Sequence, residues 1–208
     1  MSGSRIRYAY RMTHIANVEN ILQVGIVSAN SALANPNYVP IGDMTAIDTR
    51  KHKTLSDGSQ IGDYIPFYLG PRTPMLYVIQ NGYNNVPKRN VEEIVYCVIE
   101  ISDIIRDNIK CVFTDGHVLN RITKTYSGEL LGQIDNYVRY EDVYAMNWTD
   151  SPDAKRKKEA ELLLKNDLPL QYIKYFLVYN ENAKKRLIEI GLEEERIKIP
   201  QKINLFYF

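Results

Sequence analysis

Apolar and polar positions alternate in several short stretches of the chain, and this period of two predicts β-strands. Residues 5–12 alternate apolar or aromatic side chains with cationic ones, as expected of a strand with one buried face. Residues 93–101 are almost continuously apolar and rich in β-branched side chains, which predicts a strand in the interior of a sheet. Further extended segments are expected over residues 64–69, 110–114, 172–179, 196–200 and 203–208.

A spacing of three or four residues between apolar positions predicts a few short helices. Asn17 occupies an N-cap position and Gly25 a natural stop, which together place one helix over residues 18–24. Residues 182–190 show the same period and end at Gly191. Shorter helices are expected over residues 47–55, 102–106 and 117–122.

The stretch 63–77 has an unusual composition, with three prolines and a glycine among large aromatic side chains. Proline lacks a backbone donor and has a fixed φ, so the sequence predicts that no helix runs through this stretch. An extended piece over 64–69, a rigid turn over 70–74 and an apolar run over 75–79 are expected instead. From composition alone, the segment is interpreted as a rigid loop that packs aromatics over an edge of the core.

The rest of the chain predicts the fold class. Residues 27–61 and 126–147 lack a sustained period and are expected to be long loops, which are usually functional in a compact domain. Residues 154–165 contain strong helix formers, but the apolar triplet 162–164 also fits a buried strand. Many short strands, a few small helices and no regular βαβ rhythm predict an α+β fold with one mixed or antiparallel core. Since no linker is present, residues 1–208 are expected to form a single domain.

Composition narrows the function classes. The 208 residues are 45% hydrophobic with a net charge of +1, which excludes a disordered chain and gives no global signature of a nucleic-acid binder. Two local basic runs, 50–53 and 155–158, fit either solvated helix ends or a phosphate-binding rim. Cys97 and Cys111 lie in apolar runs and are expected to be buried free thiols. With no signal peptide and no apolar run of membrane-spanning length, the chain is expected in the cytoplasm and away from membranes.

Few residues stand out as candidates for chemistry. No nucleophile elbow, Walker loop or dinucleotide fingerprint occurs, and the cysteines and histidines lack the spacing of a metal site. His14 follows a predicted strand, Arg50 lies in a long loop, and Glu161 precedes an apolar run. Each also has an ordinary interpretation: a structural histidine, a solvated arginine, and a surface partner of neighbouring lysines.

Four segments in order resemble the DarT family, the DNA ADP-ribosyltransferase toxins of bacterial toxin–antitoxin systems. They are residues 63–77, 10–17 with the following 21–22, 112–117 and 158–163, and the aromatic ending 207–208 fits as well. The resemblance runs over nearly the whole chain. It implies an ADP-ribosyltransferase-like split mixed β core with short helices and long active-site loops, holding NAD in a cleft.

The same resemblance implies a toxin that transfers ADP-ribose from NAD to a base in single-stranded DNA and releases nicotinamide. The thymine-modifying branch of the family is the better match, while guanine, RNA or protein acceptors, or a non-catalytic nucleic-acid-binding module, are the alternatives. NAD is expected as co-substrate without a metal or further cofactor. A macrodomain antitoxin that removes the modification is the expected partner, and the protein is expected to be a monomer.

Residue roles also follow from the resemblance. Glu161 matches the catalytic glutamate and Arg50 an arginine that contacts NAD and acts in the reaction. The resemblance implies NAD contacts from Arg11, Met12, Thr13, His14, Asn20 and Arg50, and an acceptor-facing loop that begins at His117. Physical reasoning adds Tyr68 as a stacking partner of nicotinamide in NAD, and Arg72, Lys155 and Arg156, with His117, as DNA contacts. Histidine is common at the position of Arg11 in related proteins, so the arginine here departs from the family pattern.

These roles agree with the chemistry. Loss of nicotinamide produces an oxocarbenium-like ribose, as in glycoside hydrolysis, and a carboxylate at position 161 stabilises that charge. Arginine is effectively always protonated, so we expect Arg50 to orient NAD and to stabilise a developing thymine anion, and not to accept a proton.

Overall fold

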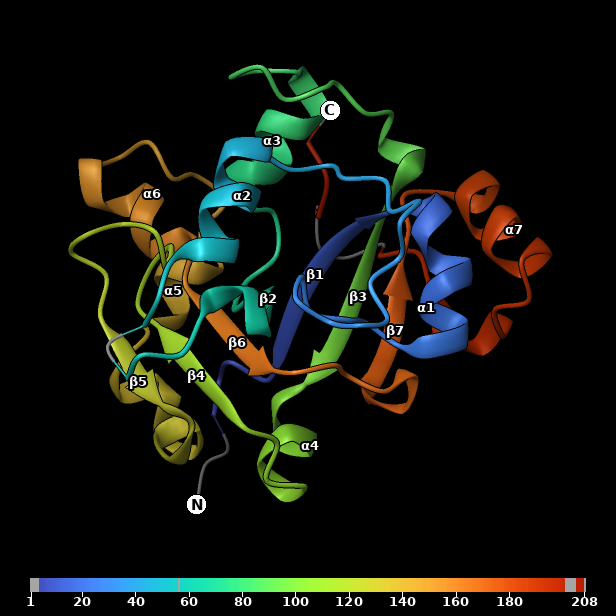
Figure 1. The fold of residues 1–208 in the computed structure, drawn as a ribbon. Helices are drawn as coiled ribbons and strands as arrows, with labels where there is room; N and C mark the ends of the chain where they lie inside the picture. The colour runs from blue at the N-terminus through green and yellow to red at the C-terminus, as the bar shows by residue number, and fades with distance from the viewer. Residues whose placement is uncertain (1–3, 56, 201–204, 208) are drawn as a thin grey trace.

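The computed structural model describes residues 4–55, 57–200 and 205–207 (Figure 1). In this part of the chain eight strands form one sheet in the order β5-β4-β6-β2-β1-β3-β7-β8. Neighbouring strands are antiparallel except β7 and β8, which are parallel, so the sheet is mixed as predicted. The strands are β1 (Tyr8–His14), β2 (Tyr64–Tyr68), β3 (Ile94–Glu100), β4 (Cys111–Thr114), β5 (Thr125–Ser127), β6 (Glu161–Lys165), β7 (Ile173–Leu177) and β8 (Ile197–Lys198).

The helices of the described residues are short. The α-helices are α1 (Val18–Val24), α2 (Met44–His52), α3 (Pro74–Asn81), α4 (Ile101–Arg106), α5 (Tyr140–Val143), α6 (Pro152–Lys158) and α7 (Glu181–Glu189). Single 3-10 turns are η1 (Ile15–Asn17), η2 (Ile61–Asp63), η3 (Val91–Glu93), η5 (Leu170–Tyr172) and η6 (Glu194–Arg196), and η4 (Gly128–Asn136) is longer. None of the helices in the described ranges has the length and apolar character needed to cross a membrane.

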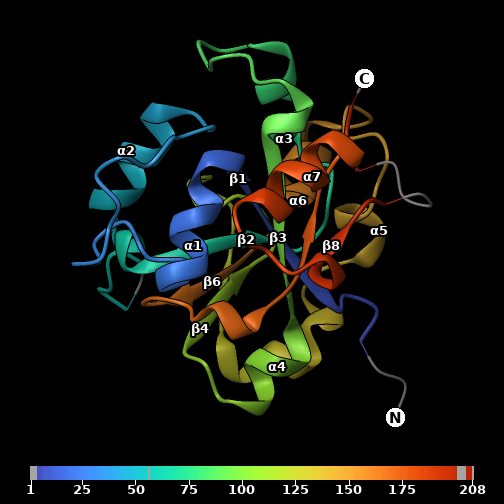
Figure 2. The same ribbon diagram turned by 90° about the vertical axis from the view of Figure 1, so that its right-hand side faces the viewer.

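The sheet is covered on both faces. One face carries Phe67, Cys97 and Leu162, and packs against apolar side chains of α1, α4, α7 and η4. The opposite face carries Tyr10 and Tyr96, and packs against α3 and the C-terminal residues 205–206. Helix α2 has no buried residue of its own and lies away from α4 and α7 (Figures 1 and 2).

The sheet divides between β1 and β2. Strand β1 pairs with β3 through seven registered residue pairs, but with β2 only through Tyr10 and Tyr68. Tyr68 is in turn in register with Glu161 at the start of β6. The two halves of the sheet therefore meet at one point, and this agrees with the expected split core.

The prediction that no helix runs through the stretch 63–77 is wrong in one respect, because helix α3 begins at Pro74. Proline is favoured at the first position of a helix, where its missing N–H has no intrahelical acceptor and its φ already suits the helix. Thr73 is the N-cap, and Gly82 ends the helix with a left-handed φ of 74°. The extended piece and the turn before it are confirmed as β2 and a bend.

Three further expectations need correction. The expected helix over 117–122 is a series of turns, in which the backbone N–H of Val118 bonds to the Glu161 carboxylate. The expected loop 126–147 contains part of β5, then η4 and α5. Residues 154–165 realise both alternatives, since α6 ends at Lys158 and the leucine triplet continues as β6 between β2 and β4.

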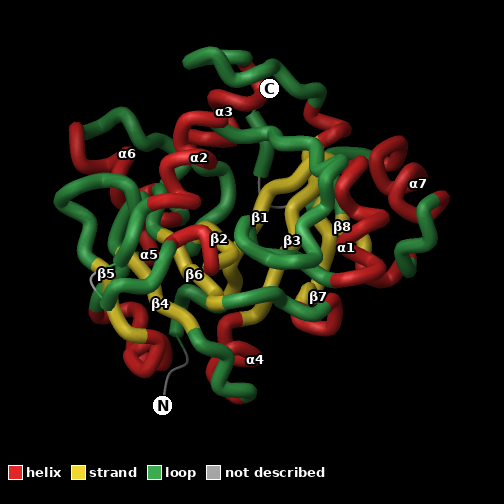
Figure 3. The backbone as a smooth tube through the Cα atoms, viewed as in Figure 1, coloured by secondary structure: helices red, strands yellow, loops and turns green. Residues whose placement is uncertain are grey.

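Other expectations hold with shifted limits. Strand β1 starts later than expected and includes His14. The short helix around Arg50 runs over Met44–His52, where Asp43 caps it, and the rest of 27–61 is mostly irregular (Figure 3). Cys97 is a buried free thiol, but Cys111 is only half-buried. Of the extended piece expected over 203–208, residues 203, 204 and 208 lie outside the described residues, and 205–207 form no strand.

The turn after β2 allows a stability prediction. A Cβ at Gly70 would lie 2.0 Å from the carbonyl oxygen of Val143, which is backbone and cannot rotate away. We expect Gly70→Ala to lower the free energy of unfolding by about 1–3 kcal/mol, the usual cost of overpacking. Gly132→Ala is the matched control, because nothing lies within 4 Å of its added Cβ. Equal urea midpoints for the two variants would contradict the prediction.

Candidate active site

A buried ion pair joins α2 to β6. Nη2 of Arg50, in the last turn of α2, donates to Oε1 of Glu161 at 2.5 Å. The Glu161 side chain is 1% exposed, and its Oε2 accepts the backbone N–H of Val118 at 2.8 Å. The backbone N–H of Glu161 donates to Oγ1 of Thr114 at 3.0 Å, which fixes the start of the strand. Both carboxylate oxygens are thus engaged, as a buried charge requires.

His117 extends this pair. Its Nε2 lies 3.1 Å from Nη2 of Arg50, and its Nδ1 lies 3.3 Å from the backbone nitrogen of Leu119. Burial lowers the pKa of His117, although the Glu161 carboxylate acts in the opposite direction. A neutral imidazole accepts on one nitrogen only, and we assign the acceptor to Nε2 because that contact is shorter and charge-assisted.

The Arg50 guanidinium keeps one donor free. Burial acts to lower the pKa of Arg50, but Glu161 outweighs it and the pKa is raised, so the group stays charged. Among the described residues Nη1 of Arg50 is buried and has no hydrogen-bond partner. Tyr68 lies beside the pair, and burial raises its pKa, so its hydroxyl is neutral. A buried donor without a partner is the expected feature of a site that awaits a ligand.

A hollow of about 400 Å³ opens next to the pair. Its walls come from α2, α3, the turn at 117–120 and α6 with the residue that follows it. His117 belongs to this wall and contacts Arg50, so the hollow adjoins the buried pair. Polar side chains in the wall are Asp43, Asn84, His117, Asn120, Lys155, Arg156 and Glu159.

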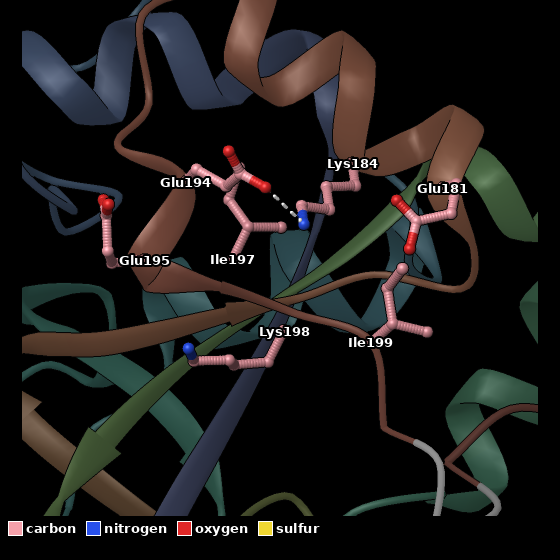
Figure 4. A pocket seen from close by; sticks show the side chains of 7 residues that line it. All are labelled: Glu181, Lys184, Glu194, Glu195, Ile197, Lys198 and Ile199. Carbon is pink, nitrogen blue, oxygen red and sulfur yellow. Dashed lines mark ion pairs between the residues drawn. The ribbon is translucent and has the colours of Figure 1, made fainter.

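A second hollow, of about 480 Å³, lies at the other end of the sheet around β8 (Figure 4). Charged side chains from α7, η6 and β8 line it, and Lys184 pairs with Glu194 at 2.8 Å. None of the residues singled out in the sequence lies in its wall.

The β1 residues expected to contact NAD are held by contacts within the protein. Nη1 of Arg11 donates to the carbonyl oxygen of Pro66 at 3.2 Å, across the division of the sheet. Oγ1 of Thr13 accepts from the Asn17 side chain at 3.1 Å. Nδ1 of His14 accepts the N–H of Ala16 at 3.1 Å.

The remaining NAD candidates differ in their surroundings. Burial lowers the pKa of His14, with Glu93 opposing it at 3.7 Å. Met12 packs in the core on the face of Tyr10, and Asn20 is half-buried on α1. Of the expected NAD contacts, only Tyr68 and Arg50 lie directly beside Glu161.

The four expected DNA contacts divide into two groups. His117, Lys155 and Arg156 all line the hollow, but Arg156 is mostly buried and bonds to Asp115 at 2.9 Å. Arg72 is outside the hollow wall. Its φ is 54°, and its guanidinium stacks 4.3 Å from the ring centre of Tyr207.

Two site residues were not predicted from the sequence: Lys158, the last cation of the basic run 155–158, and Glu159, which follows it. Lys158 is 1% exposed, and its Nζ donates to the carbonyl oxygens of Pro71 at 2.9 Å and Val143 at 2.5 Å. Burial lowers its pKa to about 7. Glu159 is 9% exposed and faces the hollow. The Glu-Ala-Glu spacing before the apolar triplet could have indicated Glu159, because side chains two residues apart in an extended segment point to the same side as each other.

Comparisons with known proteins point to one family. The family model described as "ssDNA thymidine ADP-ribosyltransferase, DarT" matches residues 10–208. A DNA ADP-ribosyl transferase of Thermus sp. (strain 2.9) is 29% identical over 183 residues, covering 87% of this chain and 85% of the relative. A DNA ADP-ribosyl transferase-DNA ADP-ribosyl glycohydrolase fusion protein of Thermosipho africanus is 27% identical over 184 residues, covering 88% of this chain and 45% of the fusion.

Solved structures give the same result. Thermus sp. 2.9 DarT in complex with ADP-ribosylated ssDNA superposes with a TM-score of 0.85 at 25% identity, covering 100% of this chain and 99% of that one. The complex of Thermus sp. 2.9 DarT with NAD+ gives a TM-score of 0.80 at 26% identity, covering 99% and 100%.

The buried pair makes a testable contribution to stability. We expect Arg50→Met to lower the free energy of unfolding by about 3–5 kcal/mol, because it leaves the Glu161 carboxylate buried without a cation. Adding Glu161→Gln should recover part of the loss, since a neutral amide needs no counter-charge. Arg121→Met, at an exposed position, is the control. Chemical denaturation of all four proteins would contradict the prediction if the Arg50 variant resembled the control.

Proposed function

This chain belongs to the DarT family and is an NAD-dependent DNA ADP-ribosyltransferase, and we propose that it modifies thymine in single-stranded DNA. The description of the matching family, which specifies thymidine, supports the choice of base. The observation that carries the proposal is the buried Arg50–Glu161 pair beside the hollow. We also propose that residues 1–208 act as one catalytic domain, because the family match and the continuous sheet span nearly all of it.

Glu161 is proposed as the residue that stabilises the transition state. When the bond between the ribose C1′ and nicotinamide breaks, its electron pair leaves with nicotinamide and positive charge develops on the ribose. A carboxylate fixed in a water-poor site stabilises this charge without reorganising. The Val118 N–H and the Arg50 guanidinium already fix both oxygens of Glu161, so its orientation is set before NAD binds.

Arg50 is proposed to act as a cation that orients NAD and stabilises the thymine anion. Its Nη1 is a buried donor that has no hydrogen-bond partner among the described residues, so a substrate oxygen can bind there without displacing a protein group. Because its pKa is raised above the already high value of arginine, Arg50 does not accept the proton of thymine.

Other residues are proposed as substrate contacts. For NAD these are Arg11, Met12, Thr13, His14 and Asn20, together with Tyr68, which lies beside the catalytic pair. For DNA, His117 and Lys155 line the hollow. We propose Arg72 and Arg156 as further DNA contacts. Stacking on Tyr207 holds the Arg72 side chain in place, and an ion pair with Asp115 holds that of Arg156.

The proposed partner is an enzyme that reverses the modification. The Thermosipho relative joins a DNA ADP-ribosyl transferase to a DNA ADP-ribosyl glycohydrolase, which supports a macrodomain antitoxin for this chain. We further propose that the protein acts as a monomeric toxin in the cytoplasm, where NAD and DNA are both available. A reaction without a metal or an additional cofactor remains a prediction.

The function can be tested on defined oligonucleotides. Single strands with one thymine in varied contexts, and matched strands without thymine, are incubated with NAD and analysed by mass spectrometry with fragmentation. We expect an ADP-ribose adduct on thymine only. In Glu161→Gln the rate should fall by at least about 10²–10³-fold, as for loss of one charge-stabilising group.

Glu189→Gln is the control, because Glu189 is exposed on α7 and remote from the pair. An adduct found on guanine, RNA or protein and not on thymine would show that the acceptor is not thymine. Equal NAD turnover by the parent and Glu161→Gln would overturn the assigned role of Glu161.

A further inference from the structure

The proposed reaction leaves one proton without an acceptor. The ring nitrogen of thymine that bonds to the ribose must lose its proton, and Arg50 cannot take it. Both oxygens of Glu161 already accept hydrogen bonds, and its charge is needed at the ribose. A further group in the hollow must therefore act as the base.

The other titratable groups that line the hollow are mostly unsuitable. Asp43 is committed to α2, since its Oδ1 accepts from the N–H groups of Thr45 and Ala46. Nε2 of His117 accepts from Arg50, so the free lone pair of its imidazole is used. Lys155 is a cation. Glu159 is the acid that remains.

The Glu159 carboxyl has the required surroundings. It is 9% exposed, it lines the hollow, and no hydrogen bond or ion pair in the described structure engages its side chain. It is thus reachable from the hollow but shielded from bulk water. Its position two residues before Glu161 places it within the field of the catalytic pair.

We propose, on the premise of the function proposed above, that the Glu159 carboxylate is the general base that accepts the thymine proton. The proton moves from the ring nitrogen to a carboxylate oxygen while that nitrogen bonds to C1′ and nicotinamide leaves neutral with its electron pair. The resulting carboxylic acid then releases its proton to water in the hollow. Glu161 accordingly stabilises the positive charge on the ribose, and Glu159 accepts the proton of thymine.

The charges around Glu159 suit this role. Burial raises its pKa to about 7, Lys155 acts to lower it, Glu161 to raise it, and Arg50 to lower it. Tyr68 on β2 and His117 in the turn also face this group, and both are neutral. A base with a pKa near the operating pH gives efficient proton transfer.

The direct test uses Glu159→Gln, which keeps the shape and removes the base. With thymine oligonucleotides under single-turnover conditions, we expect a loss of about 10²–10⁴-fold, the usual contribution of a general base. The parent rate should rise with pH with a midpoint near 7 and level off above it, and the variant should lack this step. NAD binding, measured by calorimetry, should be unchanged. Glu189→Gln again serves as the control.

A second measurement separates a base from a structural residue. Oligonucleotides with 5-fluorouracil in place of thymine carry a more acidic ring N–H, so they depend less on a base. The defect of Glu159→Gln should therefore shrink with this acceptor, and formate should partly rescue Glu159→Ala. An equal defect with both acceptors, or a Glu159→Gln profile identical to the parent's, would overturn the inference. If the parent itself modified no thymine, the proposed function would fail instead.

The titration can also be checked in the absence of substrate. Because the pKa of Glu159 is higher in the folded state than the ordinary 4.5, the folded protein binds more protons between pH 4.5 and 7. Its contribution to stability is full below pH 4.5 and is lost as pH rises towards 7. Glu159→Gln should therefore be more stable than the parent at pH 8 and gain nothing at pH 4. An equal difference at both pH values would contradict a buried titrating carboxyl.

Discussion

The ion pair between Arg50 and Glu161 constrains the whole site. Helix α2 has no fully buried apolar side chain, so hydrophobic packing holds it only weakly against the sheet. Its last turn is attached through the guanidinium to Glu161, and Nζ of Lys53 donates to the carbonyl oxygen of Val118 at 3.3 Å. Since the same carboxylate also binds the Val118 N–H, one group fixes both walls of the hollow. The geometry of the proposed catalytic pair and the local stability are therefore coupled.

The two neighbouring acids show how environment divides chemical roles. Glu161 has a guanidinium and a backbone donor within hydrogen-bond distance. The Glu159 side chain has neither among the described residues, and it lies largely buried in the wall of the hollow. The second arrangement favours a group that changes protonation near neutral pH. The pattern is known from enzymes in which two carboxyl groups of one site act as acid or base and as charge stabiliser.

Periodicity predicted the strands well, because each strand depends on its own alternation or continuous apolarity. Arg50 and Glu161 came from ordered motifs and not from local pattern, since their contact spans 111 residues of sequence. Lys158 could not be anticipated: in a run of cations it is expected to be solvated, and its burial depends on carbonyls of Pro71 and Val143. Helix α3 was missed for a local reason, because proline was taken only as a breaker and not as a first helical residue.

The division of the sheet explains why the polar groups of β1 differ from those around Arg50. Because β2 is in register with β1 only at Tyr10, the polar side chains that follow make their own contacts at this edge of β1. Arg11 bonds to Pro66, and Asn17 binds both backbone groups of Val39 at 2.8 Å, which holds the loop before α2 over this end of the strand. A nucleotide bound there has to replace or bridge these contacts. The buried Nη1 of Arg50 has no such contact to give up among the described residues, so substrate binding would add a hydrogen bond there at no cost in protein contacts.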